Sequence, residues 1–155
     1  MKSSWHYAPG VMVNGTDVYA EGGNYRVTID SEGVAHFRVW RRPDVSLDVG
    51  AAYAREMVGV FEKLMGEPWM RVRGVMLDLV DASTTWGPRT RLAVSEMFAT
   101  TERSCKWLAV VTTSDAVQMM TVASVLKKSA PRCGRVFGSL SNGRMWAGQR
   151  RRLAG

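Results

Sequence analysis

Residues 72–80 read Val-Arg-Gly-Val-Met-Leu-Asp-Leu-Val, a nearly continuous apolar run that decides the fold class. The run is too short for a typical helix and fits a strand that is buried on both faces of a sheet. A second apolar run, residues 107–112, follows after one helix-length segment. Buried strands that alternate with helix-length segments predict an α/β fold with parallel strands.

The segments around these strands have the apolar spacing of amphipathic helices. Residues 49–65 form the first, and Pro88 suits the first turn of the second. Ser114 can cap the third, with Asp115 favourable near its N-terminus. The buried stripe of the second helix is expected to be Leu92, Ala93, Val94, Met97, Phe98 and Thr101. In the third helix, the core-facing residues are expected to be Ala116, Met119, Met120, Val122, Ala123, Val125 and Leu126.

Two further strands are expected before the first helix. Residues 25–30 alternate between apolar and polar side chains, a short turn follows, and residues 34–40 resume the pattern, which predicts an antiparallel hairpin. A short strand at residues 135–137 and a last helix with Met145 and Trp146 close the chain. The predicted order is ββαβαβαβα, with a mixed, mostly parallel sheet of four to five strands and about four helices.

A length of 155 residues suits one domain. We place an α/β domain at residues 24–148. Residues 1–23 are rich in Gly, Ser and Asn and are expected to be an N-terminal extension, with room for a short strand near Asn14 and Gly15. Residues 149–155 are expected to be a basic tail.

Charge is distributed unevenly along the chain. Residues 1–115 contain 13 Lys and Arg and all 14 Asp and Glu, whereas residues 116–155 contain 8 Lys and Arg and no acid. A basic end attracts an acidic protein face, nucleic acid or anionic lipid, but it also serves simply to keep a protein in solution. The candidate basic patch consists of Lys127, Lys128, Arg132, Arg135, Arg144, Arg150, Arg151 and Arg152.

The composition bears on where the protein works. No apolar run approaches the length of a membrane span, and the first ten residues do not look like a secretory signal. The two cysteines, Cys105 and Cys133, make neither a disulfide framework nor a zinc-binding spacing. We therefore expect a cytoplasmic protein without a transmembrane segment.

Catalytic motifs are not found in the sequence. His6 and His36 stand outside any known nucleophile pattern, and phosphate-binding, dinucleotide-binding and zinc-protease motifs are missing. Asp78 and Asp81 stand three residues apart at the end of a strand, where carboxylates either bind a ligand or cap a turn. We expect no enzyme activity, no metal and no cofactor.

The polar segment from Asp81 to Pro88 is the candidate contact surface for a partner, because open α/β sheets bind ligands where strands end. Its hydroxyls lie close to a predicted helix N-terminus, which would stabilise a phosphate or could use them as caps. Trp86 would anchor an interface if its side chain is exposed, and it would only fill the edge of the core if its side chain is buried. The candidate partner-binding residues are Asp81, Ser83, Thr84, Thr85 and Trp86, and the candidate phosphoacceptors are Ser83, Thr84 and Thr85.

Three stretches resemble the STAS superfamily (sulfate transporter and anti-sigma factor antagonist domains), in its SpoIIAA-like branch. They are Val75-Met-Leu-Asp-Leu, then Leu108-Ala-Val-Val with Gln118, and then Arg135-Val-Phe-Gly-Ser with Trp146. The likeness covers about residues 24–148. The Asp-Ser-Ser-Gly signature of phosphorylated antagonists is replaced here by Asp81-Ala-Ser-Thr.

The resemblance implies a non-enzymatic regulatory module that binds a partner protein in bacterial signalling. Two alternatives remain: a domain that binds or carries a small apolar ligand or a nucleotide, and a binder of nucleic acid or an anionic surface through the basic C-terminal third. Nucleic acid ranks below a protein partner because the sequence has no groove-reading motif. An acidic partner surface and a homodimer stay open, and the sequence does not identify the partner, ligand or pathway.

Overall fold

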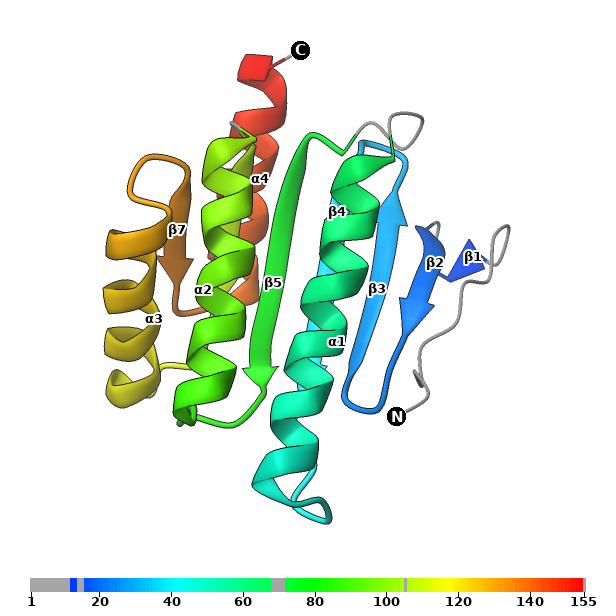
Figure 1. Ribbon diagram of the computed structural model, residues 1–155. Helices are drawn as coiled ribbons and strands as arrows, with labels where there is room; N and C mark the ends of the chain where they lie inside the picture. The colour runs from blue at the N-terminus through cyan, green and yellow to red at the C-terminus, as the bar shows by residue number, and fades with distance from the viewer. Residues whose placement is uncertain (1–11, 14–15, 68–71, 105, 155) are drawn as a thin grey trace.

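In the part of the chain that the structure describes, seven strands form one sheet and lie side by side in the order in which they occur along the chain (Figure 1). The structure, a computed structural model, describes residues 12–13, 16–67, 72–104 and 106–154. The strands are β1 (Met12–Val13), β2 (Thr16–Glu21), β3 (Tyr25–Asp30), β4 (Val34–Trp40), β5 (Gly74–Asp81), β6 (Trp107–Val111) and β7 (Gly134–Phe137). Strands β1 to β4 pair antiparallel, and β4 to β7 pair parallel.

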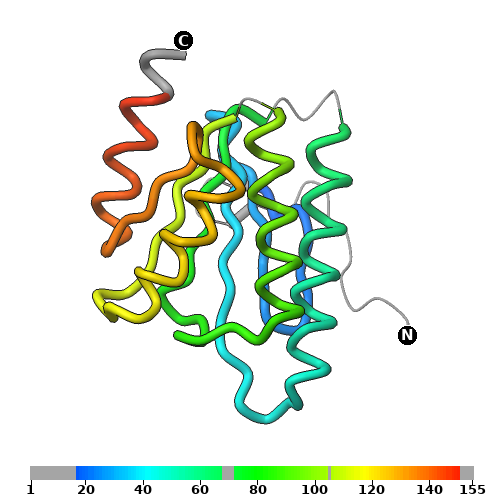
Figure 2. The backbone as a smooth tube through the Cα atoms, turned by 60° about the vertical axis from the view of Figure 1, so that its left-hand side comes forward, coloured from blue at the N-terminus to red at the C-terminus, as the bar shows by residue number. Residues whose placement is uncertain are grey.

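Three helices cover one face of the sheet and the fourth covers part of the other (Figures 1 and 2). Helices α1 (Leu47–Gly66), α2 (Pro88–Arg103) and α3 (Ala116–Ser129) each connect two parallel strands. Helix α4 (Leu140–Ala154) lies alone on the opposite face against β5, β6 and β7. The α/β class, the mixed sheet and the four helices predicted from the sequence are confirmed.

The predicted number of strands is wrong, and so is the start of the predicted order. The sheet has seven strands instead of four to five because β1 and β2 precede the expected hairpin. It is not mostly parallel, since three of its six pairings are antiparallel. The pairing of β2 shifts between Val18 and Ala20, and this bulge hides the alternation that marks a strand. The sheet thus begins before residue 24, and α4 extends into residues 149–154.

Local signals explain where the elements begin and turn. Between β3 and β4, the carboxylate of Asp30 accepts hydrogen bonds from the backbone N–H groups of Glu32 and Val34, and Gly33 has a positive φ of 83°. Ser46 caps α1 by accepting from the N–H of Val49. Asp115, and not Ser114 as expected, is the N-cap of α3.

The sheet has a core on each face. The larger one packs α1, α2 and α3 on the sheet and includes Phe37 and Phe61, whose rings meet edge to face at 5.8 Å. The smaller one lies under α4 and includes Met76 and Val111. Gly143 lets α4 approach β6 closely, since a Cβ there would lie 2.7 Å from a methyl carbon of Val111. The parallel half of the sheet is therefore fixed from both sides.

Candidate functional site

The carboxyl ends of β4, β5 and β6 meet at one edge of the sheet, together with the first turns of α1, α2 and α3 (bottom of Figure 1). We call this region the carboxyl edge. It contains the segment from Asp81 to Pro88, which leaves β5 and enters α2. Ligand and partner sites of open α/β sheets are usually built from such loops. The segment from Asp81 to Pro88 thus lies between the end of a strand and the start of a helix, at the carboxyl edge.

Asp81 ties β4 to β5. Its carboxylate accepts a hydrogen bond from the Arg38 guanidinium at 2.9 Å, and its carbonyl oxygen accepts from the N–H of Arg41 at 2.9 Å. The hydrogen bond to Asp81 raises the pKa of Arg38 above its ordinary value. Both side chains are more than half exposed, so the pair contributes little stability. A partner that used Asp81 would have to compete with Arg38.

The three loop hydroxyls differ in their surroundings. Ser83 is half-buried, and its Oγ donates to the carbonyl oxygen of Thr85 at 3.0 Å, which closes a local turn. Thr84 and Thr85 are exposed. None of the three caps α2: its N-cap is Gly87, which makes no side-chain capping bond. The expected capping role is therefore wrong, and the exposed hydroxyls are those of Thr84 and Thr85.

Trp86 is half-buried and packs against the main core, so it is neither a free anchor nor a complete plug. It lines two hollows of the surface, a cleft between α1 and the 81–88 segment and a groove between α2 and α3. Replacing Trp86 would therefore alter packing and surface together. Residues beside it are better probes of the surface.

The cleft has a volume of about 310 Å³, at the lower end of the usual range for small-molecule sites. Trp40, Tyr53 and Trp86 contribute aromatic walls, and its floor is apolar: Val39, Ala54, Met57, Leu77, Leu79 and Val94. At its rim, Arg42 donates two hydrogen bonds of 2.8 Å to the carboxylate of Asp44. This contact lowers the pKa of Asp44 to about 2.

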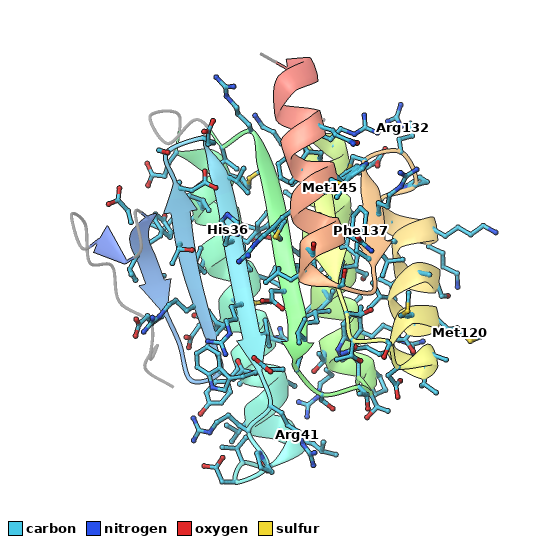
Figure 3. The ribbon with its side chains drawn as sticks, turned by 180° about the vertical axis from the view of Figure 1, so that it is seen from behind. His36, Arg41, Met120, Arg132, Phe137 and Met145 are labelled. Atoms are coloured by element: carbon cyan, nitrogen blue, oxygen red, sulfur yellow. The ribbon has the colours of Figure 1, made fainter. Side chains whose placement is uncertain are left out.

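Sequence reasoning missed the part of the cleft that comes from β4 and α1. A signal was present, because Trp40 ends a strand parallel to β5 and Arg41 follows it directly. Applying the strand-end rule to β4 as well as β5 would have found them. Figure 3 shows Arg41 in the connection after β4, at the carboxyl edge.

The groove between α2 and α3 has a volume of about 890 Å³, and Trp86, Leu92 and Val125 are among its lining residues. Large apolar side chains are exposed in the first five residues of three helices at this edge. They are Leu47 (89%) in α1, Leu92 (59%) in α2, and Val117 (59%) and Met120 (72%) in α3. We call these four residues, with Trp86, the apolar edge.

The expectation that Leu92 and Met120 face the core is wrong, and Ala116 and Ala123 are also exposed. In α2 the buried residues are Ala93, Val94, Met97, Phe98 and Thr101, and the 3.6-residue period places Leu92 opposite the middle of this stripe. In α3 the buried residues are Gln118, Val122, Val125 and Leu126. The apolar side chains outside these stripes face solvent.

Gln118, which belongs to the STAS-like pattern, fastens the loop before α3 to β5. It is 1% exposed. Its Oε1 accepts from the N–H and the hydroxyl of Thr113 at 2.9 and 3.0 Å, and its Nε2 donates to the carbonyl oxygen of Leu79 at 3.2 Å. These bonds satisfy backbone groups at the ends of two neighbouring strands. Gln118 therefore has a structural role at the carboxyl edge.

The residues of the predicted basic patch come from α3, β7, α4 and the turn before β7, and two of them, Arg135 and Arg150, lie over the ring of Trp146. Lys127 and Lys128 in the last turn of α3, Arg132 in the turn before β7, and Arg150 late in α4 lie toward the amino ends of the parallel strands. Arg135 is on β7 and Arg144 is in the second turn of α4. Arg151 and Arg152 continue α4, but their side chains are outside the described ones.

Within the described ranges, no three His, Cys, Asp or Glu side chains come together as a metal site requires. His36 lies in mid-strand with Nε2 3.0 Å from the Asp30 carboxylate, and His6 and Cys105 lie outside the described residues. None of the helices in the described part of the chain has both the length and the apolar character needed to cross a bilayer.

The fold has a counterpart among solved structures. No family model matches the chain, and no curated protein does. The fold is similar to that in the structure titled "NMR Structure of the protein TM1081", with 12% identity and a TM-score of 0.49. The match covers 90% of this chain and 91% of that chain. A likeness at this level carries nothing about function.

Proposed function

We propose that the protein is a cytoplasmic STAS-like regulatory module of the SpoIIAA-like type, which binds a partner protein and catalyses no reaction. The observation that supports this best is the apolar edge. Four large apolar side chains are more than half exposed in the first turns of three neighbouring helices, and two of them, Leu47 and Leu92, line hollows together with Trp86. Exposed apolar side chains that gather at one edge are typical of a protein interface.

The chemistry of the apolar edge fits a regulated interface. Met120 is flexible and polarisable, which suits an adaptable contact, and Trp86 provides a large, partly rigid surface. Thr84 and Thr85 are exposed beside them. A phosphate on either hydroxyl would bring negative charge to an apolar contact and weaken it. Phosphorylation of this segment is thus the regulation that we propose.

The test compares apolar-edge variants with a matched variant elsewhere. Leu92→Ser and Met120→Ser change exposed residues, so both should fold normally. Met145→Ser is the control: its side chain is 62% exposed but lies on α4, on the other face of the sheet (Figure 3). We expect proteins captured from a native lysate by the wild type and the control to be lost with Leu92→Ser and Met120→Ser.

Purified partners should then show the same difference, with binding weakened roughly tenfold or more by Leu92→Ser with Met120→Ser. Equal recovery with all baits would refute the role of the apolar edge. If Met145→Ser alone abolished the capture of partners, the interface would lie on α4 and not at the apolar edge.

A second candidate function, binding of a small apolar ligand, is favoured by the cleft. Its apolar floor and three aromatic walls suit a flat ligand of low polarity. Gly50 lines the cleft, and a Cβ at this position would meet no atom within 4 Å. Gly50→Leu should therefore obstruct the cleft without a clash.

Gly59→Leu is the matched control, because Gly59 is also in α1, also has open space at its Cβ, and does not line the cleft. We expect the fluorescence of bound anilinonaphthalene sulfonate to fall with Gly50→Leu and to persist with Gly59→Leu. Equal fluorescence of both variants and the wild type would show that the dye does not bind in the cleft, and it would refute this second function.

A further inference from the structure

Basic side chains from six elements gather at the end of the molecule opposite the apolar edge. Arg73 and Lys106 precede β5 and β6, Arg103 and the pair Lys127 and Lys128 end α2 and α3, and Arg150 is late in α4. We call these residues, with Arg132 before β7, the basic end. Only four of the seven were in the predicted patch, because the fold adds three from the first 115 residues.

The acid nearest to this cluster is already engaged. Glu102, near the end of α2, accepts a hydrogen bond of 2.7 Å from the Arg132 guanidinium. The same carboxylate accepts from the backbone N–H groups of Arg132 and Cys133 at 3.1 and 3.0 Å. Glu32 lies close to Arg73, whose backbone N–H donates to the carbonyl oxygen of the adjacent Gly33 at 2.8 Å. Among the described side chains, Arg132 is the member of the basic end that forms an ion pair with an acid.

Helix ends alone do not account for this arrangement. Lys and Arg in the last turn of a helix stabilise its negative end, which explains Arg103, Lys127 and Lys128 in part. Arg73 stands before β5, where no helix ends. Lys106 follows the end of α2, and its backbone N–H donates to the carbonyl oxygen of Thr101 at 3.3 Å. Arg150 lies over the ring of Trp146, with its guanidinium carbon 4.9 Å from the ring centroid. The excess of charge at this end thus points to a binding role.

We propose that the basic end binds the phosphate backbone of a nucleic acid without reading its sequence. Among the described residues, the exposed large hydrophobic side chains lie at the carboxyl edge or on α4 at Met145, and none lies at the basic end. A bilayer surface usually also receives apolar side chains, whereas phosphate contacts need only cations. The basic end is separate from the apolar edge. Figure 3 shows Arg132 and Met120 at opposite ends of the side of the molecule that carries α3 and β7.

Fluorescence anisotropy with a short labelled DNA duplex and a short labelled single-stranded RNA tests the proposal. If about five phosphates are contacted, the logarithm of the binding constant for the duplex should fall with the logarithm of salt concentration at a slope of about −4.5. Lys127→Gln with Lys128→Gln and Arg150→Gln should make this slope shallower by about 2 to 3 and weaken binding at least tenfold. Binding of both probes supports backbone recognition in general, and binding of one identifies the preferred strand form.

The matched control is Arg41→Gln with Arg55→Gln and Arg91→Gln, which removes the same charge from exposed positions away from the basic end. This control should retain most of the binding. Equal weakening by both triple variants would show that only net charge matters, and it would overturn the proposal. So would binding to phosphatidylserine vesicles without binding to either nucleic acid.

A thermal melt of each variant shows whether it is folded. If the first triple variant does not fold, Arg73→Gln with Arg103→Gln and Lys106→Gln replaces it, with the same expected loss. Retention of full binding by a folded basic-end variant also overturns the proposal.

Discussion

The two ends of the parallel half of the sheet differ in what they expose. At the carboxyl edge, helices begin and large apolar side chains face solvent. At the basic end, the same helices finish and cations gather. Helix dipoles explain part of the second pattern, because cations favour helix C-termini, but they do not explain exposed apolar groups at helix N-termini. The apolar edge is therefore the clearer sign of a partner.

The largest effect should separate a core residue from an apolar-edge residue of the same helix. Phe98 is fully buried and Leu92 is 59% exposed, both in α2. Phe98→Ala should lower the free energy of unfolding by about 3 to 5 kcal/mol because it leaves a cavity. Leu92→Ala should change it by less than about 0.5 kcal/mol.

Urea denaturation measures both, with the slope against urea checked for constancy. A large loss for Leu92→Ala would mean that Leu92 is packed in the core. The apolar edge would then lose one of its residues.

A smaller loss of stability is expected when the hydrogen bonds of Gln118 at the carboxyl edge are removed. Gln118→Leu keeps the size of the side chain but leaves the N–H of Thr113 and the carbonyl oxygen of Leu79 without these partners in a buried region. We expect a loss of about 2 to 3 kcal/mol in the free energy of unfolding. Gln149→Leu, on the exposed surface of α4, is the control and should be nearly neutral. A neutral Gln118→Leu would show that water satisfies these groups.

Much of this architecture could be predicted from the sequence because its signals are local. The apolar runs of β5 and β6 and the helical spacing of α1 to α3 depend on periodicity, and the strand-end rule located the segment from Asp81 to Pro88. The pair Asn14 and Gly15 left room for a short strand before residue 24, but the extent of β2 could not be predicted, because its bulge shifts the alternation between Val18 and Ala20.

The two surfaces were harder to predict than the elements. Leu92 stands next to the buried Ala93, and Met120 stands two residues from the buried Gln118 and Val122. Each residue along a helix turns the side chain by about 100°, so a shift of one or two positions moves it from the core toward solvent. The basic end joins Arg73, Arg103 and Lys106 to the C-terminal cations only through sheet pairing and helix packing. Contacts between distant segments carry no periodic signal in the sequence.

The smallest effect concerns the acid at the basic end. The hydrogen bond from Arg132, followed by that from the N–H of Cys133, lowers the pKa of Glu102 from 4.5 to about 2. Because the folded-state pKa is lowered, the charged carboxylate adds stability above pH 4.5, and this contribution is lost as the pH falls from 4.5 to about 2. Glu102→Gln should therefore melt below the wild type at neutral pH, and the two melting curves should converge near pH 2.

Arg132→Gln removes the main donor to Glu102 and should show most of the same pH dependence, and the double variant should add little. Glu102→Gln also removes the acid from the basic end, so it should tighten nucleic-acid binding slightly while leaving the apolar edge unaffected. Weaker nucleic-acid binding by a folded Glu102→Gln would mean that the position of Arg132, which this carboxylate holds, matters more than the charge that is gained. Partner binding that followed the same pH change would contradict the separation of the two ends.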